Sequence, residues 1–164
     1  MSTPRTPLPP LDEEAAKAFW GRYLTTTGAQ PGDGYTDLTF FGDSVELADE
    51  LIDLVLIGQK RATASSVDEL EHEGIAVPRV GDRWIACDGT GRPRALIETI
   101  EVREGPLSSV DEGFAWDEGE GDRTRDDWLR GHTSYYKRTF AADGLEFHED
   151  IPVIFERFTV PYQE

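Results

Sequence analysis

The sequence predicts a protein of the α+β class, and three patterns lead to this prediction. Residues 47–55 carry apolar side chains at helical spacing on one face and acidic side chains on the other. Residues 83–88 and 94–102 are strand-like runs joined by an Asp-Gly-Thr-Gly segment, which predicts a hairpin. Residues 152–162 form a further strand-like apolar run, which we interpret as the closing strand.

The chain of 164 residues has the length of one domain with a short tail. Residues 1–11 are rich in proline and lack periodicity, so we expect a disordered tail. Residues 12–24 repeat apolar side chains about every four positions and predict a helix, and a loop rich in Gly and Pro follows it. We therefore divide the chain into the tail, an N-terminal helix and loop over residues 12–34, and a main domain over residues 35–163.

The first candidate site lies at the end of the helix predicted over residues 47–55 and in the segment after it. Asp43 or Ser44 can cap the start of this helix, and Gly58 suits a left-handed cap at its end. Lys60 follows, and Thr63 comes where a strand is predicted to begin. The negative end of the helix dipole favours a lysine here, and a β-branched residue suits a strand. The alternative is that helix and strand hold Lys60 and Thr63 at the mouth of a pocket.

Two short elements and one buried carboxylate are predicted after this site. Residues 67–73 predict a short helix that ends at Gly74, and residues 78–82 predict a turn. In the second strand of the hairpin, Glu98 falls on the same side as apolar residues. A buried carboxylate needs a partner, so we expect Glu98 to be an ion-pair residue or a site residue.

Two further helices are predicted before the closing strand. One begins at Ser109, with a glutamate at the capping-box position, and ends near Gly119. The other begins at Thr124 and closes at Gly144. An acidic loop rich in glycine, residues 118–122, separates them.

The charge of the chain restricts its partners. The net charge is −17, from 33 acidic and 16 basic residues. Cations that neutralise phosphates dominate the affinity of proteins for nucleic-acid duplexes, so we expect no binding to duplex DNA. A small substrate, such as a nucleoside, or a short single strand of RNA is more compatible with this charge.

Composition also restricts cofactors and location. Cys87 is the single cysteine and lies in an apolar run, as expected of a core residue. One cysteine and three histidines argue against a structural zinc site. The chain has no apolar run with the length of a signal peptide or of a membrane span, so we expect a cytoplasmic protein without membrane contact.

Several motifs, in a fixed order over residues 35–163, resemble one protein family, the ASCH domain family. The motifs are Glu46-Leu47-Ala48-Asp49-Glu50-Leu51, Gly58-x-Lys60-x-x-Thr63, Gly81-Asp82, Val110-Asp111-Glu112-x-Phe114-Ala115, Glu118-Gly119-Glu120-Gly121-Asp122-Arg123, Trp128, His132, Glu149-Asp150-x-Pro152-Val153 and Glu156-x-Phe158. The chain is most similar to the larger subgroup, which carries the Glu-Gly-Glu-Gly-Asp motif. The resemblance implies a PUA-like mixed β-barrel with helices at its rim, related to an RNA-binding fold, and an additional N-terminal helix.

The resemblance implies two hydrolytic activities, of which a ribonuclease acting on single-stranded RNA is the first. A protein of the larger subgroup is described as a metal-stimulated ribonuclease. In that case Glu118, Glu120 and Asp122 offer oxygen ligands to Mn²⁺ or Mg²⁺. Lys60 would lie against the phosphate and His132 would transfer a proton. The alternatives are that the acidic loop is a solvated turn and that His132 is a hydrogen-bonded core residue.

The second implied activity is an amidohydrolase that removes the acetyl group of N4-acetylcytidine and needs no cofactor. Small ASCH proteins use a lysine, a threonine three residues later and a glutamate, which correspond here to Lys60, Thr63 and Glu118. Glu120 is a rival for the role of Glu118, because the acidic loop is longer in this chain. A threonine hydroxyl needs a nearby base, and a lysine is such a base only when its pKa is lowered.

The remaining candidates are substrate-binding residues. They are Arg61, Arg83, Glu120, Arg123, Trp128 and Tyr135. Arginines can bind phosphate or ribose and aromatic rings can stack on a pyrimidine, although surface and core roles are the common alternatives. A third hypothesis is a regulator without enzymatic activity, which would bind RNA or a nucleotide in the same cleft.

Overall fold

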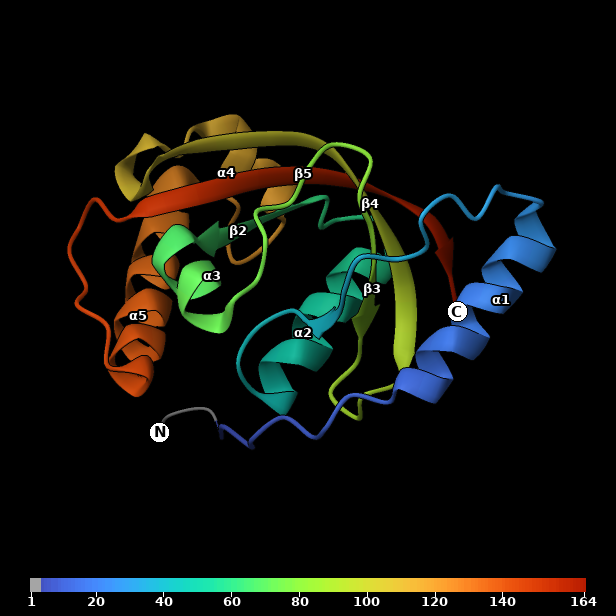
Figure 1. The fold of residues 1–164 in the computed structure, drawn as a ribbon. Coiled ribbons are helices and arrows are strands. Elements are labelled where there is room, and N and C mark those ends of the chain that lie inside the picture. Colours follow the sequence, from blue (N-terminus) through green and yellow to red (C-terminus); the bar gives the residue numbers. More distant parts are fainter. Residues whose placement is uncertain (1–3) are drawn as a thin grey trace. The chain divides into compact units, whose positions relative to one another are not determined.

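The computed structural model describes residues 4–164, and its α+β architecture is the one predicted (Figure 1). The elements follow the chain as α1 (Glu13–Thr27), β1 (Leu38–Phe40), α2 (Val45–Leu56), β2 (Ala62–Ser66), α3 (Val67–Glu73), β3 (Arg83–Cys87), β4 (Pro93–Pro106), the 3-10 turn η1 (Leu107–Ser109), α4 (Glu112–Glu118), α5 (Arg125–Asp143) and β5 (Pro152–Gln163). The strands are hydrogen-bonded in the order β1-β3-β4-β5-β2. The sheet is mixed, because β1 is parallel to β3 whereas the β3–β4 and β2–β5 pairs are antiparallel.

The chain forms two compact units that interleave in sequence. The first holds the residues up to Gly58 together with Gly81–Glu98 and Thr159–Glu164, and the second holds Gln59–Val80 and Thr99–Phe158. The strands β4 and β5 therefore contribute residues to both units. Every group of the candidate site described below lies in the second unit.

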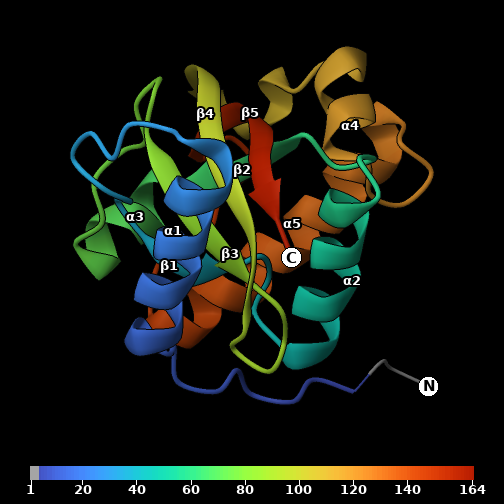
Figure 2. The same cartoon turned by 90° about the vertical axis from the view of Figure 1, so that its right-hand side faces the viewer.

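The first unit has a core between α1 and the strands. Its members are Ala16, Phe19 and Tyr23 of α1 together with Leu38, Ile85, Cys87 and Leu96 of β1, β3 and β4. Figure 2 shows α1 along one side of β3 and α2 on the other side. The predicted core position of Cys87 is confirmed, and burial raises the pKa of its thiol to about 12.

The N-terminal segment is held against the first unit. Residues 4–11 have no helix or strand, but the backbone N–H and the hydroxyl of Thr6 both donate to the carboxylate of Glu46, at 2.8 and 2.5 Å. The N–H of Val45 donates to the carbonyl of Thr6 at 2.9 Å. Residues 4–11 are therefore attached to the first unit at Thr6, and residues 1–3 of the predicted tail lie outside the described residues.

The caps of the helices follow local sequence closely, with one exception. Ser44 rather than Asp43 caps α2, and Gly58 has the expected left-handed backbone with φ +89°. The helix predicted to begin at Ser109 instead begins at Glu112, so that prediction is wrong. Its physical reason is that Asp111 accepts the N–H of Phe114 at 2.7 Å, while the preceding residues form the turn η1.

The second unit has a core around the inner faces of α4 and α5 and one face of β2 and β5. The buried residues of this core are Ala62, Leu107, Val110, Phe114, Ala115, Trp128, Tyr136, Phe140, Ile151, Val153 and Phe155.

None of the helices in the described part of the chain is both long and apolar enough to cross a membrane.

The buried carboxylate in the strands is not the predicted one. Glu98 is half-buried and has no hydrogen-bond or ion-pair partner among residues 4–164. Glu156 is buried instead, and its carboxylate accepts the hydroxyl of Thr99 at 2.7 Å. Strand periodicity identified a carboxylate near the core, but the pairing of distant strands decides which position is enclosed.

Candidate functional site

The side chain of Lys60 is buried at the free edge of β2, with only 1% of its surface exposed. Its ammonium Nζ donates to the carbonyl of Ala62 at 2.8 Å and lies 2.8 Å from Glu120 Oε2 and 3.5 Å from Glu118 Oε1. The N–H of Phe158 binds the carbonyl of Arg61, so the next carbonyl, that of Ala62, points away from β5. Lys60 therefore satisfies an edge carbonyl that no strand covers.

Glu118 is the last residue of α4 and lies on its buried face. It follows Phe114 by four positions and Ala115 by three, and such residues share one face of a helix. Its carboxylate accepts hydrogen bonds from Nε1 of Trp128 and from His132 Nε2, the latter at 3.1 Å. A short helix thus delivers a buried carboxylate to three donors.

His132 is held on both of its ring nitrogens. Nδ1 lies 3.0 Å from the carbonyl oxygen of Trp128, and Nε2 faces the carboxylate of Glu118. The imidazole stacks on the Trp128 indole at 3.7 Å between centroids. Because both neighbours are acceptors, this arrangement favours a proton on each ring nitrogen, which is the imidazolium form.

The pKa values of the three buried groups are set by their mutual attraction. Burial acts to lower the pKa of Lys60, but the carboxylates of Glu120 and Glu118 outweigh it and raise that pKa. Burial acts likewise on His132, and Glu118 outweighs it, so its pKa is also raised. Burial acts to raise the pKa of Glu118, but His132 and Lys60 lower it. Lys60 is therefore an ammonium ion rather than the base that a threonine nucleophile needs.

The loop after α4 is fitted tightly against the segment that carries Lys60. The backbone N–H of Arg61 donates to the carbonyl of Asp117 at 2.7 Å, and Nε2 of Gln59 donates to the carbonyl of Gly119 at 2.7 Å. Gly119 has φ +75°, and a Cβ there would lie 2.5 Å from the Gln59 oxygen. Both the positive φ and the close approach to the backbone of Gln59 require glycine at position 119. The loop in this conformation places Glu120 over Lys60.

Thr63 is directed to the other face of the sheet. The alternate residues Ala62 and Ala64 pack against the core of the second unit, so Thr63 points away from that core. It lies directly opposite Glu156 in the β2–β5 ladder, and residues so paired share one face. The Thr63 hydroxyl makes no hydrogen bond within residues 4–164.

The predicted substrate-binding residues have different surroundings. Arg61 Nη1 donates to the carbonyl of Lys60 at 2.8 Å, and the ring of Tyr135 packs edge-on against Tyr136 at 5.5 Å. Trp128 is only 5% exposed, and its indole contacts Glu118 through Nε1 and stacks on His132. It therefore holds these two side chains in place. Arg83 belongs to the first unit, where its guanidinium binds the carbonyls of Gln30 and Pro31. The contacts of Arg123 are described in the last Results subsection.

The predicted metal ligands come together only in part. Asp122 is exposed, and its carboxylate accepts the N–H and hydroxyl of Thr124 at 2.9 and 2.5 Å. The third potential ligand of Glu118 and Glu120 is instead His132, with the three ligand atoms within 4.8 Å of one another. The spacing of acids in the sequence could not reveal this, because His132 reaches them from α5.

Tyr136 also belongs to this neighbourhood, although Tyr135 was the tyrosine predicted to bind substrate. It lies one turn after His132, with ring centroids 6.1 Å apart, and it is 1% exposed. Its hydroxyl has no hydrogen-bond partner among residues 4–164. Burial raises the pKa of this hydroxyl well above its ordinary value, and the nearby Tyr135, Glu118, Glu69 and Glu120 add to the effect. The spacing from His132 was the available signal.

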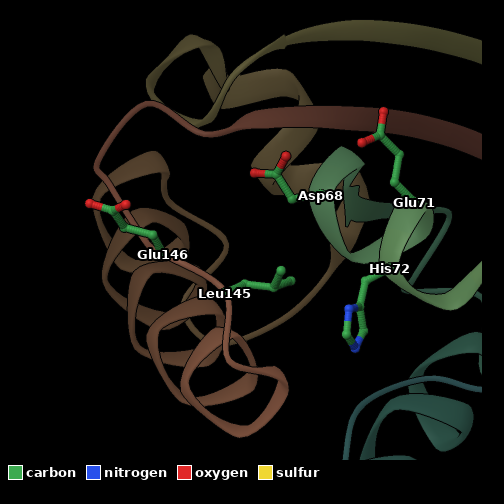
Figure 3. A pocket seen from close by; sticks show the side chains of 5 residues that line it. All are labelled: Asp68, Glu71, His72, Leu145 and Glu146. Carbon is green, nitrogen blue, oxygen red and sulfur yellow. The ribbon is translucent and has the colours of Figure 1, made fainter.

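A hollow of about 490 Å³ opens elsewhere in the second unit (Figure 3). It is lined by Asp68, Glu71 and His72 of α3 and by Leu145 and Glu146 after α5. None of the predicted site residues lines it. Its lining has three carboxylates and no lysine or arginine, so it does not suit an anionic substrate.

Comparison with known proteins gives the family. The ASCH domain model matches residues 37–162, so the chain belongs to the ASCH domain family, as its motifs predict. The ASCH domain of Lactobacillus crispatus JV V101 is 30% identical with a TM-score of 0.81, over 93% of this chain and 97% of that one. A protein of Enterococcus faecalis V583, assigned to the family model DUF984, is 32% identical with a TM-score of 0.81, over 91% and 89%. No curated protein matches. The fold is consistent with a PUA-like barrel, and family membership supports an RNA-related domain in general terms.

Replacement of Lys60 is expected to destabilise the protein strongly. Lys60→Met leaves the buried Glu118 and the partly buried Glu120 without their ammonium partner, and breaking a buried pair costs roughly 3–5 kcal/mol. The double variant Lys60→Met/Glu118→Gln should recover part of this loss, because it removes one of the two charges. Urea unfolding of the three proteins measures the effect. A loss below about 1 kcal/mol for Lys60→Met would contradict the ion-pair account.

Removal of the Tyr136 hydroxyl is expected to leave stability unchanged or higher. A buried hydroxyl without a partner costs about 1–3 kcal/mol, and Tyr136→Phe removes that cost. The matched variant Tyr162→Phe loses a hydrogen bond to Glu164 of 2.6 Å and should be slightly less stable than the wild type. Thermal unfolding compares them, and a clearly lower midpoint for Tyr136→Phe would show that the hydroxyl has a partner.

Proposed function

We propose that this protein is a ribonuclease that cleaves single-stranded RNA by general acid–base catalysed phosphoryl transfer at the cluster of Lys60, Glu118, Glu120 and His132. One observation carries the proposal: the Lys60 ammonium lies within ion-pair distance of the carboxylates of Glu118 and Glu120, and Glu118 also lies 3.1 Å from the imidazole of His132. Two of them are accessible, since the side chains of Glu120 and His132 are 28% and 14% exposed. A substrate can approach these two first.

The proposed reaction assigns a role to each group. Glu120 accepts the proton of a ribose 2′-hydroxyl, and that oxygen attacks the adjacent phosphorus. The bond from phosphorus to the 5′-oxygen breaks, and the imidazolium of His132 donates its proton to the leaving oxygen. The products are a 2′,3′-cyclic phosphate and a free 5′-hydroxyl. Lys60, buried behind Glu120, holds that carboxylate in place and contributes positive charge near the phosphoryl oxygens, and Glu118 orients His132 and favours its protonated form.

An alternative is that His132 binds a divalent cation instead of carrying a second proton. Two carboxylates and one imidazole suit Mn²⁺, and Glu118, Glu120 and His132 would hold it. A bound cation would supply electrostatic stabilisation of the phosphate. Lys60 already neutralises part of the carboxylate charge, and the raised pKa of His132 opposes binding to a metal. We therefore expect cleavage in the presence of EDTA.

Deacetylation of N4-acetylcytidine is a second candidate, favoured by the contact of Lys60 with Glu118 at 3.5 Å. Its third residue, Thr63, faces Glu156 on the other side of β2, which weakens this candidate. A regulator that binds RNA without enzymatic activity would leave both RNA and N4-acetylcytidine chemically unchanged. Incubation with short RNA and with N4-acetylcytidine, with Mn²⁺ or EDTA, followed by mass spectrometry, separates the three functions.

The variant Glu120→Gln is expected to lower the rate of RNA cleavage about 100-fold or more, because general acid–base groups contribute that much. Glu120 is partly exposed, so this variant should fold. Glu71→Gln, which neutralises an exposed glutamate of α3, is the matched control and should cleave at the rate of the wild type. A rate for Glu120→Gln equal to that of the control would remove Glu120 from the mechanism.

The rate of cleavage should fall as the pH rises through the folded-state pKa of His132, which lies above 6.5.

The free energy of unfolding should also fall as the pH rises through this pKa. A raised pKa stabilises the folded protein fully below the unfolded value, and this contribution is lost as the pH passes the folded one. His132→Asn should lack this loss of stability. Thermal unfolding across this pH range is the measurement, and an unchanged profile in His132→Asn would contradict the assignment.

A further inference from the structure

An exposed indole marks the outer face of α4. Trp116 is 57% exposed, whereas Phe114, Ala115 and Glu118 of the same helix are buried. The helix therefore packs without this side chain. Folding leaves this ring at the surface, where Arg123 lies over it.

Arg123 is held over this ring. Its guanidinium carbon lies 3.7 Å from the centroid of the Trp116 ring, and its Nε donates to the carbonyl of Trp116 at 2.9 Å. Arg123 is also the one non-glycine residue with a positive φ, +65°, within the described chain. A left-handed backbone costs a residue with a Cβ roughly 1–2 kcal/mol. The turn thus holds the arginine in a definite place at some cost in stability.

The two terminal nitrogens of Arg123 have no partner within residues 4–164, although the chain carries 33 acidic residues. Two other arginines differ. Arg157 binds Asp117 and Glu101, and Arg83, which also lies over an indole, uses its terminal nitrogens on carbonyl groups. Arg123 therefore presents a flat cation with unused donors, and such donors suit phosphate oxygens.

The stacked pair adjoins the candidate site through one turn. The N–H of Arg123 donates to the carbonyl of Glu120 at 3.1 Å, which closes a four-residue turn. The ends of such a turn lie within about 7 Å of each other. Glu120 in turn binds Lys60 at 2.8 Å. A chain of nucleotides with its reacting phosphate at Glu120 would carry a neighbouring nucleotide past Arg123.

We propose that Trp116 and Arg123 form a binding subsite for a nucleotide next to the cleaved bond. An unpaired base stacks on the indole, and the terminal nitrogens of Arg123 bind the adjacent phosphate. Aromatic stacking of this kind accepts any base, so the subsite provides affinity for single strands without sequence preference. This inference rests on the proposed function for the identity of the ligand and deepens it.

The test is binding of fluorescein-labelled 2′-O-methyl oligouridine, measured by anisotropy at low salt. This probe lacks the free 2′-hydroxyl, so binding is measured without cleavage. Trp116→Ala and Arg123→Gly are each expected to weaken binding about tenfold or more, because stacking contributes 1–3 kcal/mol per base. Glycine suits the left-handed backbone at position 123, so that variant should fold. Arg130→Ala, which removes another exposed cation of the second unit, should bind as the wild type does.

The outcomes separate the subsite from the proposed function. Weaker binding by both variants, with unchanged thermal midpoints, supports the subsite whether or not unmodified RNA is cleaved. Wild-type affinity in both variants overturns the subsite, and so does a wild-type protein that does not bind the probe. An equal loss in Arg130→Ala would overturn it as well, because net charge would then explain the affinity. Cleavage of unmodified oligouridine by the wild type tests the function separately.

Discussion

The burial of the Lys60 ammonium is the constraint on which the rest of the site depends. An isolated charge in a core is strongly unfavourable, so the fold must bring opposite charges and acceptors to it. It does so with an edge carbonyl of β2 and two carboxylates. The two carboxylates come from the end of α4 and the loop after it. The position of α4 relative to β2 is therefore fixed by electrostatics as well as by the core of the second unit.

The same constraint extends to α5. Glu118 compensates Lys60 but is itself buried, and it accepts hydrogen bonds from Trp128 and His132 as well. Two cations and two carboxylates therefore balance locally in a chain whose net charge is −17. This local balance makes a phosphate-directed chemistry possible within an acidic protein, because the two cations offset the charge of the two carboxylates where the substrate would bind.

The glycine-rich loop connects this cluster to the outer surface. Gly119 permits the close approach to Gln59 that sets Glu120 over Lys60, and the turn from Glu120 to Arg123 leads to the exposed indole of Trp116. One short segment thus provides the proposed base and the proposed contact with a neighbouring nucleotide. A substitution in this loop would affect both functions together, whereas Trp116 can be changed without touching the cluster.

The sequence by itself determined the fold class, the family and most helix caps, and it selected Lys60 and Glu118 as candidate site residues, because periodicity, capping and motif order are local properties. Only the tertiary structure decided the partners of these residues. In the structure, His132 rather than Asp122 is the third potential metal ligand beside Glu118 and Glu120, and Thr63 is paired with Glu156 on the other face of β2. The physical reason is that the register of β2 against β5 and the approach of α5 to α4 join segments far apart in the chain, and no local pattern specifies which side chains then meet.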